Sequence, residues 1–159
     1  MNQPNLRLVE DDLAPQAPAP DPLIGRVLDG RYLIEKVLGE GGMGLVYRAK
    51  HTALGKPLAV KVLRAEVSKD QEIVQRFRQD AQSATAIGNE HIIDISDFGT
   101  LPDGSTYFVM EFLDGVSVTK AIEVDRPIPA PRIAKIAKQI CTALGAAHEA
   151  GIVHRDLKP

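Results

Sequence analysis

Five short stretches of the chain show strand patterns, some mixing apolar with polar residues and others, such as residues 57–63, forming short apolar runs. β-Branched and aromatic residues recur in all of them, as is typical of strands. Pro102-Asp103-Gly104, between the last two, is typical of a hairpin turn, and Asp29-Gly30 predicts a turn before the first. We therefore predict a five-stranded antiparallel sheet built from residues 32–38, 45–50, 57–63, 92–98 and 106–112.

Helical spacing of apolar residues interrupts this strand pattern after the third stretch. The first helix follows Ser68, which with Gln71 resembles a capping box, and it ends at Gly88. Its apolar residues are Ile73, Phe77, Ala81, Ala84 and Ile87. Together with the strands it predicts an α+β fold.

The last part of the chain is predicted to be helical. After Leu113-Asp114-Gly115 comes a short helical stretch, and Pro129-Ala130-Pro131 opens a longer helix that ends before Gly151. We interpret the single cysteine, Cys141, as a small core residue of this helix. The apolar stripe of the helix comprises Ile133, Ile136, Ala137, Ile140, Cys141, Leu144 and Ala147.

Composition narrows the class of protein. The 159 residues are 44% apolar and 25% charged with a net charge of −2, which indicates a soluble globular protein and argues against a nucleic-acid binder. We expect no membrane segment, because no apolar run reaches membrane length, and without a signal peptide we expect a cytoplasmic location. Residues 1–22 are rich in proline and alanine and carry acidic residues, so we predict a disordered tail.

The chemistry of the chain is concentrated between the first and third predicted strands. Glycines at 39, 41, 42 and 44 leave one side of a tight turn without β-carbons, so backbone N–H groups could approach a phosphate. A dinucleotide oxidoreductase also has such glycines, but there a helix follows them, whereas here a strand follows. Lys61 lies within an apolar strand; alone it would be a lysine that reaches solvent, but after a glycine-rich hairpin it indicates a phosphate ligand.

These features occur in one order with the final His154-Arg155-Asp156-Leu157-Lys158-Pro159, and this order resembles the eukaryotic-like serine/threonine protein kinases of bacteria. The resemblance implies a kinase N-lobe over residues 23–113, with five antiparallel strands and one helix. Residues 114–159 would leave the hinge and form the first helices of a helical C-lobe. The implied activity is transfer of the γ-phosphoryl group of ATP to serine or threonine hydroxyls of a protein substrate.

The resemblance also implies a nucleotide site. In it, Leu38, Val46 and Ala59 would enclose the adenine, the glycine-rich turn would cover the phosphates, and Lys61 would hold the α- and β-phosphates. Met110 would guard the back of the pocket, and the backbone of Glu111 and Leu113 would bind the adenine edge. The full set is Leu38, Gly39, Glu40, Gly41, Gly42, Met43, Gly44, Val46, Ala59, Lys61, Asp80, Met110, Glu111 and Leu113.

Catalytic roles follow from the same resemblance. Asp156 would accept the proton of the substrate hydroxyl, and Lys158 would contact the phosphoryl group while Lys61 anchors ATP. Lysine two places after the aspartate favours serine or threonine over tyrosine as acceptor. His154 would pack beneath the catalytic loop, and Arg155 would pair with a phosphorylated activation loop.

Two departures from the family pattern bear on activity. Asp80 stands where the family has the glutamate that pairs with the strand lysine, one methylene shorter. The catalytic-loop asparagine and the Asp-Phe-Gly aspartate, which hold Mg²⁺, do not occur within residues 1–159, so no residue here is assigned as a metal ligand. We therefore expect this chain alone to be inactive. Two alternatives to a protein kinase remain: a kinase-like nucleotide-binding module without catalysis, and an interaction protein that works through the exposed apolar stripe of the last helix.

Overall fold

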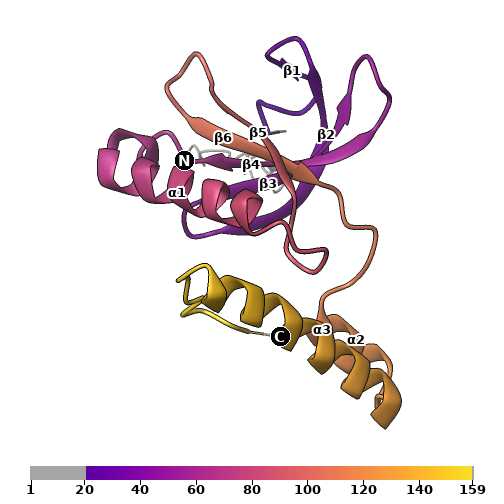
Figure 1. Ribbon diagram of the computed structural model, residues 1–159. Helices are drawn as coiled ribbons and strands as arrows, with labels where there is room; N and C mark the ends of the chain where they lie inside the picture. Colours follow the sequence, from indigo (N-terminus) through magenta and orange to yellow (C-terminus); the bar gives the residue numbers. More distant parts are fainter. Residues whose placement is uncertain (1–20, 159) are drawn as a thin grey trace, which may run out of the picture.

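The computed structural model describes residues 21–158, and the predicted disordered tail therefore lies almost entirely outside the described residues. One antiparallel sheet of six strands, in the order β1-β2-β3-β4-β6-β5, forms the upper part of the molecule (Figure 1). The strands are β1 (Val27–Leu28), β2 (Tyr32–Gly41), β3 (Gly44–His51), β4 (Pro57–Leu63), β5 (Ile95–Thr100) and β6 (Thr106–Glu111).

The predicted α+β class is confirmed, but the predicted strand number is one too low. The additional strand is β1, in which Val27 and Leu28 pair with Leu33 and Tyr32 of β2. Two residues are too few to show an alternating pattern. The turn that joins β1 to β2 is the predicted one, with Asp29 at φ 47° and Gly30 at φ 68°.

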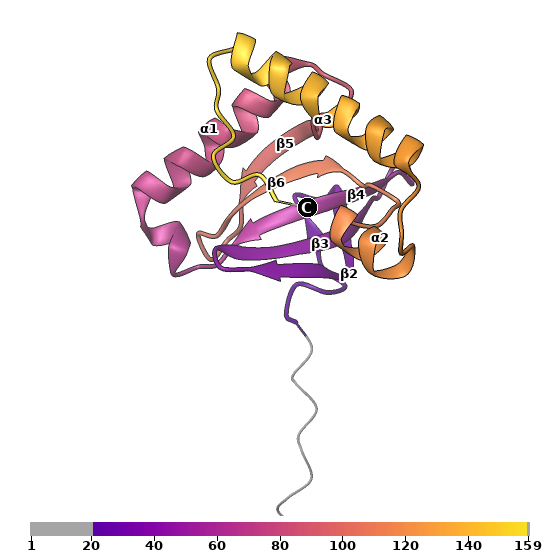
Figure 2. The ribbon, with the colours of Figure 1, turned by 90° about the horizontal axis from the view of Figure 1, so that it is seen from below.

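Helix α1 (Gln71–Ile87) packs across one face of the sheet (Figures 1 and 2). Phe77 and Ala81 of the helix are buried against Leu63 of β4 and Phe108 of β6. The rings of Phe77 and Phe108 stack with their centres 4.6 Å apart. A second, larger apolar cluster fills the other side of the sheet and includes Tyr32, Tyr47, Val60, Tyr107 and Val109.

The ends of α1 show one error and one success of the sequence analysis. The predicted cap at Ser68 is wrong: Ser68 lies in a 3₁₀ turn, η1 (Val67–Lys69), and its hydroxyl accepts the N–H of Thr106 at 3.1 Å. Asp70 caps the helix instead, accepting the N–H groups of Glu72 and Ile73. The predicted stop at Gly88 is confirmed, because this residue has φ 59°.

Helices α2 (Val118–Val124) and α3 (Ala130–Glu149) lie below the sheet (Figures 1 and 2). As predicted, α3 has proline in its first turn and a glycine of positive φ, Gly151, after its end. Ala147 is buried, but Ile133 is 52% exposed and Cys141 is exposed as well. The prediction of Cys141 as a core residue is therefore wrong, because no element within residues 21–158 covers its side of α3. None of the helices in residues 21–158 has the length and apolar character needed to span a membrane.

Candidate functional site

A cavity of about 350 Å³ opens at the point where the sheet meets the segment that leads to α2. Strand register explains its walls: Ala59 of β4 pairs with Arg48 of β3 and with Met110 of β6, and directly paired residues point to one face of a sheet. Val46, two residues from Arg48, shares this face. Six predicted site residues meet here, namely Leu38, Val46, Ala59, Met110, Glu111 and Leu113.

The sequence analysis missed the other residues that line this cavity: Ile93, Phe112, Asp114 and Gly115. Three of them lie within two residues of Leu113 in the sequence, so the predicted hinge could have pointed to them. Ile93 was expected in a strand over residues 92–98, but β5 begins only at Ile95, so Ile93 lies in the loop before it.

The segment between β6 and α2 lines one side of the cavity. Glu111, the last residue of β6, is fixed to the loop before β5: the Glu111 N–H donates to the Asp94 carbonyl at 3.0 Å, and Asp94 N–H donates to Glu111 Oε1 at 2.9 Å. The N–H and C=O of Leu113 have no hydrogen-bond partner within residues 21–158. They are available to the edge of a planar heterocycle held between the apolar walls.

The glycine-rich turn forms the tip of the β2–β3 hairpin, where Gly41 pairs with Gly44. A β-carbon added at Gly39 or Gly42 would meet no atom within 4 Å, so both positions border open space. Gly44 is different, because its β-carbon would lie 2.0 Å from the carbonyl oxygen of Val62 on β4. Close approach of two strands, rather than access for phosphate, therefore requires glycine at this position.

Arg64, just after β4, holds the tip of the hairpin. Its N–H donates to the carbonyl of Met43 at 3.0 Å, and its guanidinium forms an ion pair with Glu40. Met43 itself is 58% exposed. Glu40 and Met43, two of the predicted phosphate-covering residues, thus contact Arg64, and neither lines the cavity.

Lys61 is half-buried on the same face of the sheet as Val46, its partner on β3. Its ammonium nitrogen lies 5.7 Å from the ring centre of Phe77 and 5.8 Å from that of Phe108. No carboxylate within residues 21–158 forms an ion pair with it. Asp80 is exposed on α1, so the structure does not bring Lys61 and Asp80 together, and the role of Asp80 stays a prediction.

The predicted catalytic segment follows α3 and is exposed. Lys158 Nζ donates to Asp156 Oδ2 at 2.9 Å. This hydrogen bond and the lysine charge lower the pKa of the Asp156 carboxyl and so favour its ionised form. The Asp156 N–H lies 3.3 Å from His154 Nδ1, and Arg155 between them has φ 61°.

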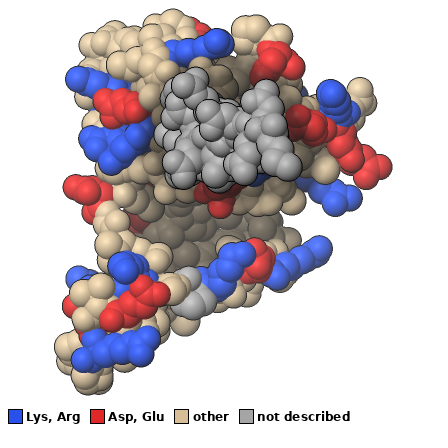
Figure 3. All heavy atoms as spheres, turned by 180° about the vertical axis from the view of Figure 1, so that it is seen from behind, with Lys and Arg blue, Asp and Glu red and all other residues tan. Residues whose placement is uncertain are grey.

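Seen from behind, the surface is hollowed between the sheet and the lower helices, and charged residues stand mostly at the margins of this hollow (Figure 3). Within residues 21–158 there is no group of three or more His, Cys, Asp or Glu side chains that could hold a metal ion. These residues therefore offer no cluster that would hold a metal ion through protein side chains alone.

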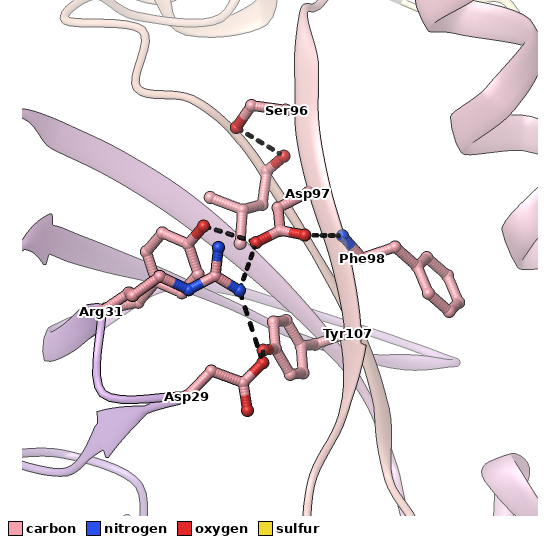
Figure 4. A network of polar contacts seen from close by, with 8 residues as sticks. Asp29, Arg31, Ser96, Asp97, Phe98 and Tyr107 are labelled. Carbon is pink, nitrogen blue, oxygen red and sulfur yellow. Dashed lines mark hydrogen bonds and ion pairs between the residues drawn. The ribbon is translucent and has the colours of Figure 1, made fainter.

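A polar network that the sequence analysis missed joins the start of the sheet to β5 (Figure 4). Asp97 accepts the hydroxyl of Tyr32 at 2.6 Å and forms an ion pair with Arg31 at 2.8 Å. The hydroxyl of Tyr107 donates to Asp29. Burial opposes ionisation of Asp97, but the Tyr32 hydroxyl, the Phe98 N–H and Arg31 outweigh it and lower the pKa. The network fixes β1 and β2 against β5 at a distance from the cavity.

Comparison with known protein families decides the identity of this fold. The family described as "Protein kinase domain" matches residues 32–159. The chain belongs to the protein kinase family. Among curated relatives, it is 44% identical over 146 residues to the serine/threonine-protein kinase Pkn1 of Myxococcus xanthus, covering 92% of this chain and 20% of Pkn1. It is 39% identical over 137 residues to the serine/threonine-protein kinase PrkC of Bacillus subtilis, covering 86% of this chain and 21% of PrkC.

Solved structures agree with this kinase assignment. The crystal structure of the PknI kinase domain of Mycobacterium tuberculosis superposes with a TM-score of 0.69 at 29% identity, covering 85% of this chain and 55% of that one. The resemblance to bacterial serine/threonine kinases noted in the sequence is thus confirmed. The chain spans only about a fifth of the length of the curated relatives it matches.

Proposed function

We propose that this chain forms the ATP-binding part of a serine/threonine protein kinase, which transfers the γ-phosphoryl group of ATP to a protein hydroxyl. The observation that carries the proposal is the cavity itself: apolar walls from β2, β3 and β4 face a hinge whose Leu113 N–H and C=O are unpartnered within residues 21–158. Adenine is a flat apolar ring with donors and acceptors on its edge, so it matches both features.

The chain's own residues would position ATP as follows. Leu38, Val46 and Ala59 hold the ring, and the hinge backbone reads its edge. The open backbone at Gly39 and Gly42 approaches the phosphates. Lys61 leaves its cation–π contacts with the rings of Phe77 and Phe108 to pair with the α- and β-phosphates, since an ion pair with phosphate is stronger than a cation–π contact.

In the transfer step, the substrate hydroxyl oxygen bonds to the γ-phosphorus while the bond from that phosphorus to the β–γ bridging oxygen breaks. The hydroxyl proton passes to the Asp156 carboxylate, and Lys158 offers a positive charge to the transferred group. Magnesium, when bound, neutralises charge on the phosphates, and its ligands are not found among the described residues. We therefore propose that residues 1–159 alone bind ATP without transferring phosphate.

A kinase-like module that binds nucleotide or a partner without catalysis is the second candidate. The observation that favours it is the separation of Lys61 from Asp80, because the lysine of an active kinase is held by a carboxylate. The two candidates differ in one expected result: in a protein that carries a whole kinase domain, the first predicts phosphoryl transfer and the second predicts none.

The test has two parts. Titration of the 159-residue chain with a fluorescent ATP analogue should show saturable binding that unlabelled ATP displaces; no binding would remove the nucleotide site. The second part joins residues 1–159 to the remaining C-lobe of the PrkC kinase domain and measures labelled phosphate on a generic protein. Transfer to serine or threonine that Asp156→Asn abolishes supports the enzyme; a folded, ATP-binding chimaera without transfer supports the binding module.

The remaining assignments are also proposals. We divide the chain into an N-lobe of residues 23–113 and a partial C-lobe of residues 114–159. The arrangement in Figure 1 supports this division, because the sheet and α1 together form the upper part of the molecule and α2 and α3 form the lower part. A protein substrate with a serine or threonine acceptor is supported by the names of its relatives. A cytoplasmic location for this part of the chain is supported by the need of the proposed reaction for ATP. Binding of nucleic acid is not expected at a net charge of −2.

A further inference from the structure

Phe112 is the one aromatic residue of the hinge segment 111–115, and it lines the cavity. The guanidinium carbon of Arg48, on β3, lies 5.1 Å from the centre of its ring. This distance is that of a cation–π contact. Arg48 is therefore in direct contact with the segment whose backbone faces the proposed adenine position.

Arg48 is itself held from the neighbouring strand. Its Nε lies 3.1 Å from Oε2 of Glu35 on β2. The β2–β3 register shifts between Ile34 and Lys36, so Glu35 is the additional residue of a β-bulge. Bulges redirect side chains, and this one places a carboxylate beside the Arg48 guanidinium.

The contact between Glu35 and Arg48 is electrostatic rather than a well-aligned hydrogen bond. Arg48 Nε is buried and has no hydrogen-bond partner of good geometry within residues 21–158. Both side chains are only partly exposed, 39% for Arg48 and 34% for Glu35. A partly buried guanidinium without aligned hydrogen bonds depends on the carboxylate and the Phe112 ring for its position.

The strand register gives this contact a consequence for the cavity. Arg48 pairs with Ala59, which pairs with Met110, and the latter two line the cavity. Arg48 therefore lies on the same face of the sheet as the cavity, two residues after Val46 on β3. The hinge leaves the sheet after Glu111 and is held on one side by the two hydrogen bonds between Glu111 and Asp94. Arg48 contacts the next residue of the hinge, Phe112, through its ring.

We propose that Glu35, Arg48 and Phe112 form a hinge clamp and that Arg48 is a positioning residue for recognition of the nucleobase. The clamp fixes the hinge so that the Glu111 carbonyl accepts from the 6-amino group of adenine and the Leu113 N–H donates to N1. It rests on the proposed function, because it specifies how the same site distinguishes adenine from a 6-oxopurine. Inosine triphosphate carries an acceptor at position 6 and a donor at N1, so it opposes both hinge groups.

The test compares binding of ATP and inosine triphosphate to the 159-residue chain by displacement of a fluorescent ATP analogue. Arg48→Met should weaken ATP about fivefold, the size of one lost cation–π contact, and leave inosine triphosphate nearly unchanged. The preference for ATP therefore falls by the same factor. Arg48→Lys, which keeps the charge over the ring, should restore most of the preference.

A matched control is present in the chain. The guanidinium carbon of Arg78 lies 4.8 Å from the ring centre of Phe98, away from the cavity, so Arg78→Met removes the same kind of contact. It should leave both affinities unchanged. If Arg48→Met lowers the melting temperature, Glu35→Gln, which leaves Arg48 in place, should still reduce the preference for ATP.

The possible results distinguish a failure of the hinge clamp from a failure of the proposed ATP site. If the parent chain binds ATP, and Arg48→Met and Glu35→Gln keep its affinity and its preference over inosine triphosphate, the clamp is wrong while the proposed function stands. An equal loss in Arg48→Met and Arg78→Met also contradicts the clamp, since the loss would then be general. If the parent chain binds neither nucleotide, the proposed function fails and the clamp fails with it.

Discussion

The ammonium group of Lys61 faces the ring of Phe77 at 5.7 Å, so a strand and helix α1 meet through a cation and an aromatic face. A carboxylate would hold the lysine more strongly, but Asp80, three residues after Phe77, is exposed to solvent. The aromatic contact keeps a half-buried ammonium satisfied without fixing it. In the proposed function, this contact leaves Lys61 free to turn to phosphate when nucleotide binds.

Replacing Lys61 by methionine should weaken ATP binding by about tenfold, because charge-assisted hydrogen bonds to phosphate are lost. Titration with a fluorescent ATP analogue measures the change. Lys50→Met is the control, because Lys50 is an exposed lysine of the neighbouring strand β3. Equal affinities of Lys61→Met and the parent chain would remove Lys61 from the phosphate site.

A longer side chain at position 80 tests whether Asp80 fails to pair with Lys61 only because its side chain is too short. Asp80→Glu adds one methylene and should tighten ATP binding about threefold, the value of a partly exposed ion pair that preorganises the lysine. Asp80→Asn keeps the size of the side chain without its charge and should not tighten binding. A fall in affinity for Asp80→Glu would show that position 80 does not support Lys61.

Substitution of two glycines in the same hairpin should have opposite outcomes. In Gly44→Ala the new β-carbon would lie 2.0 Å from the Val62 carbonyl oxygen, so β3 and β4 must separate, and we expect a loss of about 3 kcal/mol in the free energy of unfolding. Gly42→Ala meets no atom within 4 Å and should change that free energy by less than about 0.5 kcal/mol. Urea denaturation of both variants decides the matter. Similar midpoints would mean that the two strands are not so close in solution.

All three tyrosines should titrate above the usual range while the chain is folded. Burial and the hydrogen bond to Asp97 raise the pKa of Tyr32 to about 12. Burial and hydrogen bonds to Asp21 and Asp29 raise the pKa values of Tyr47 and Tyr107. Unfolded tyrosine titrates near pH ~10. The stabilisation from these protonated hydroxyls is therefore complete below that pH and is lost as pH rises through the folded values.

Absorbance of tyrosinate, recorded beside far-UV circular dichroism, measures this titration. The folded chain should show little tyrosinate at pH values where the urea-unfolded chain is fully ionised. Tyr32→Phe should remove one tyrosine from the late titration and reduce the alkaline loss of stability. Ionisation of Tyr32 or Tyr107 near the unfolded pKa while the dichroism is still native would contradict the network in Figure 4, and that of Tyr47 would contradict its hydrogen bond to Asp21.

The sequence by itself determined the local elements of this protein. The glycine-rich hairpin, the stop at Gly88 and the proline start of α3 depend on neighbours within a few residues, and the structure has all of them. Four of the five predicted strands lie where they were expected, whereas the one predicted over residues 92–98 is shifted to Ile95–Thr100. It also placed six of the residues that line the cavity, through the resemblance to kinases.

Only the tertiary structure decided which distant residues meet. Strand β1 exists because two residues find partners on β2, and Gly44 is required because β4 passes close to it. The contact of Arg48 with Phe112 joins positions far apart in the sequence, and that of Lys61 with Phe77 joins a strand to a helix. Such contacts depend on register and packing, which local patterns of apolar and polar residues do not specify.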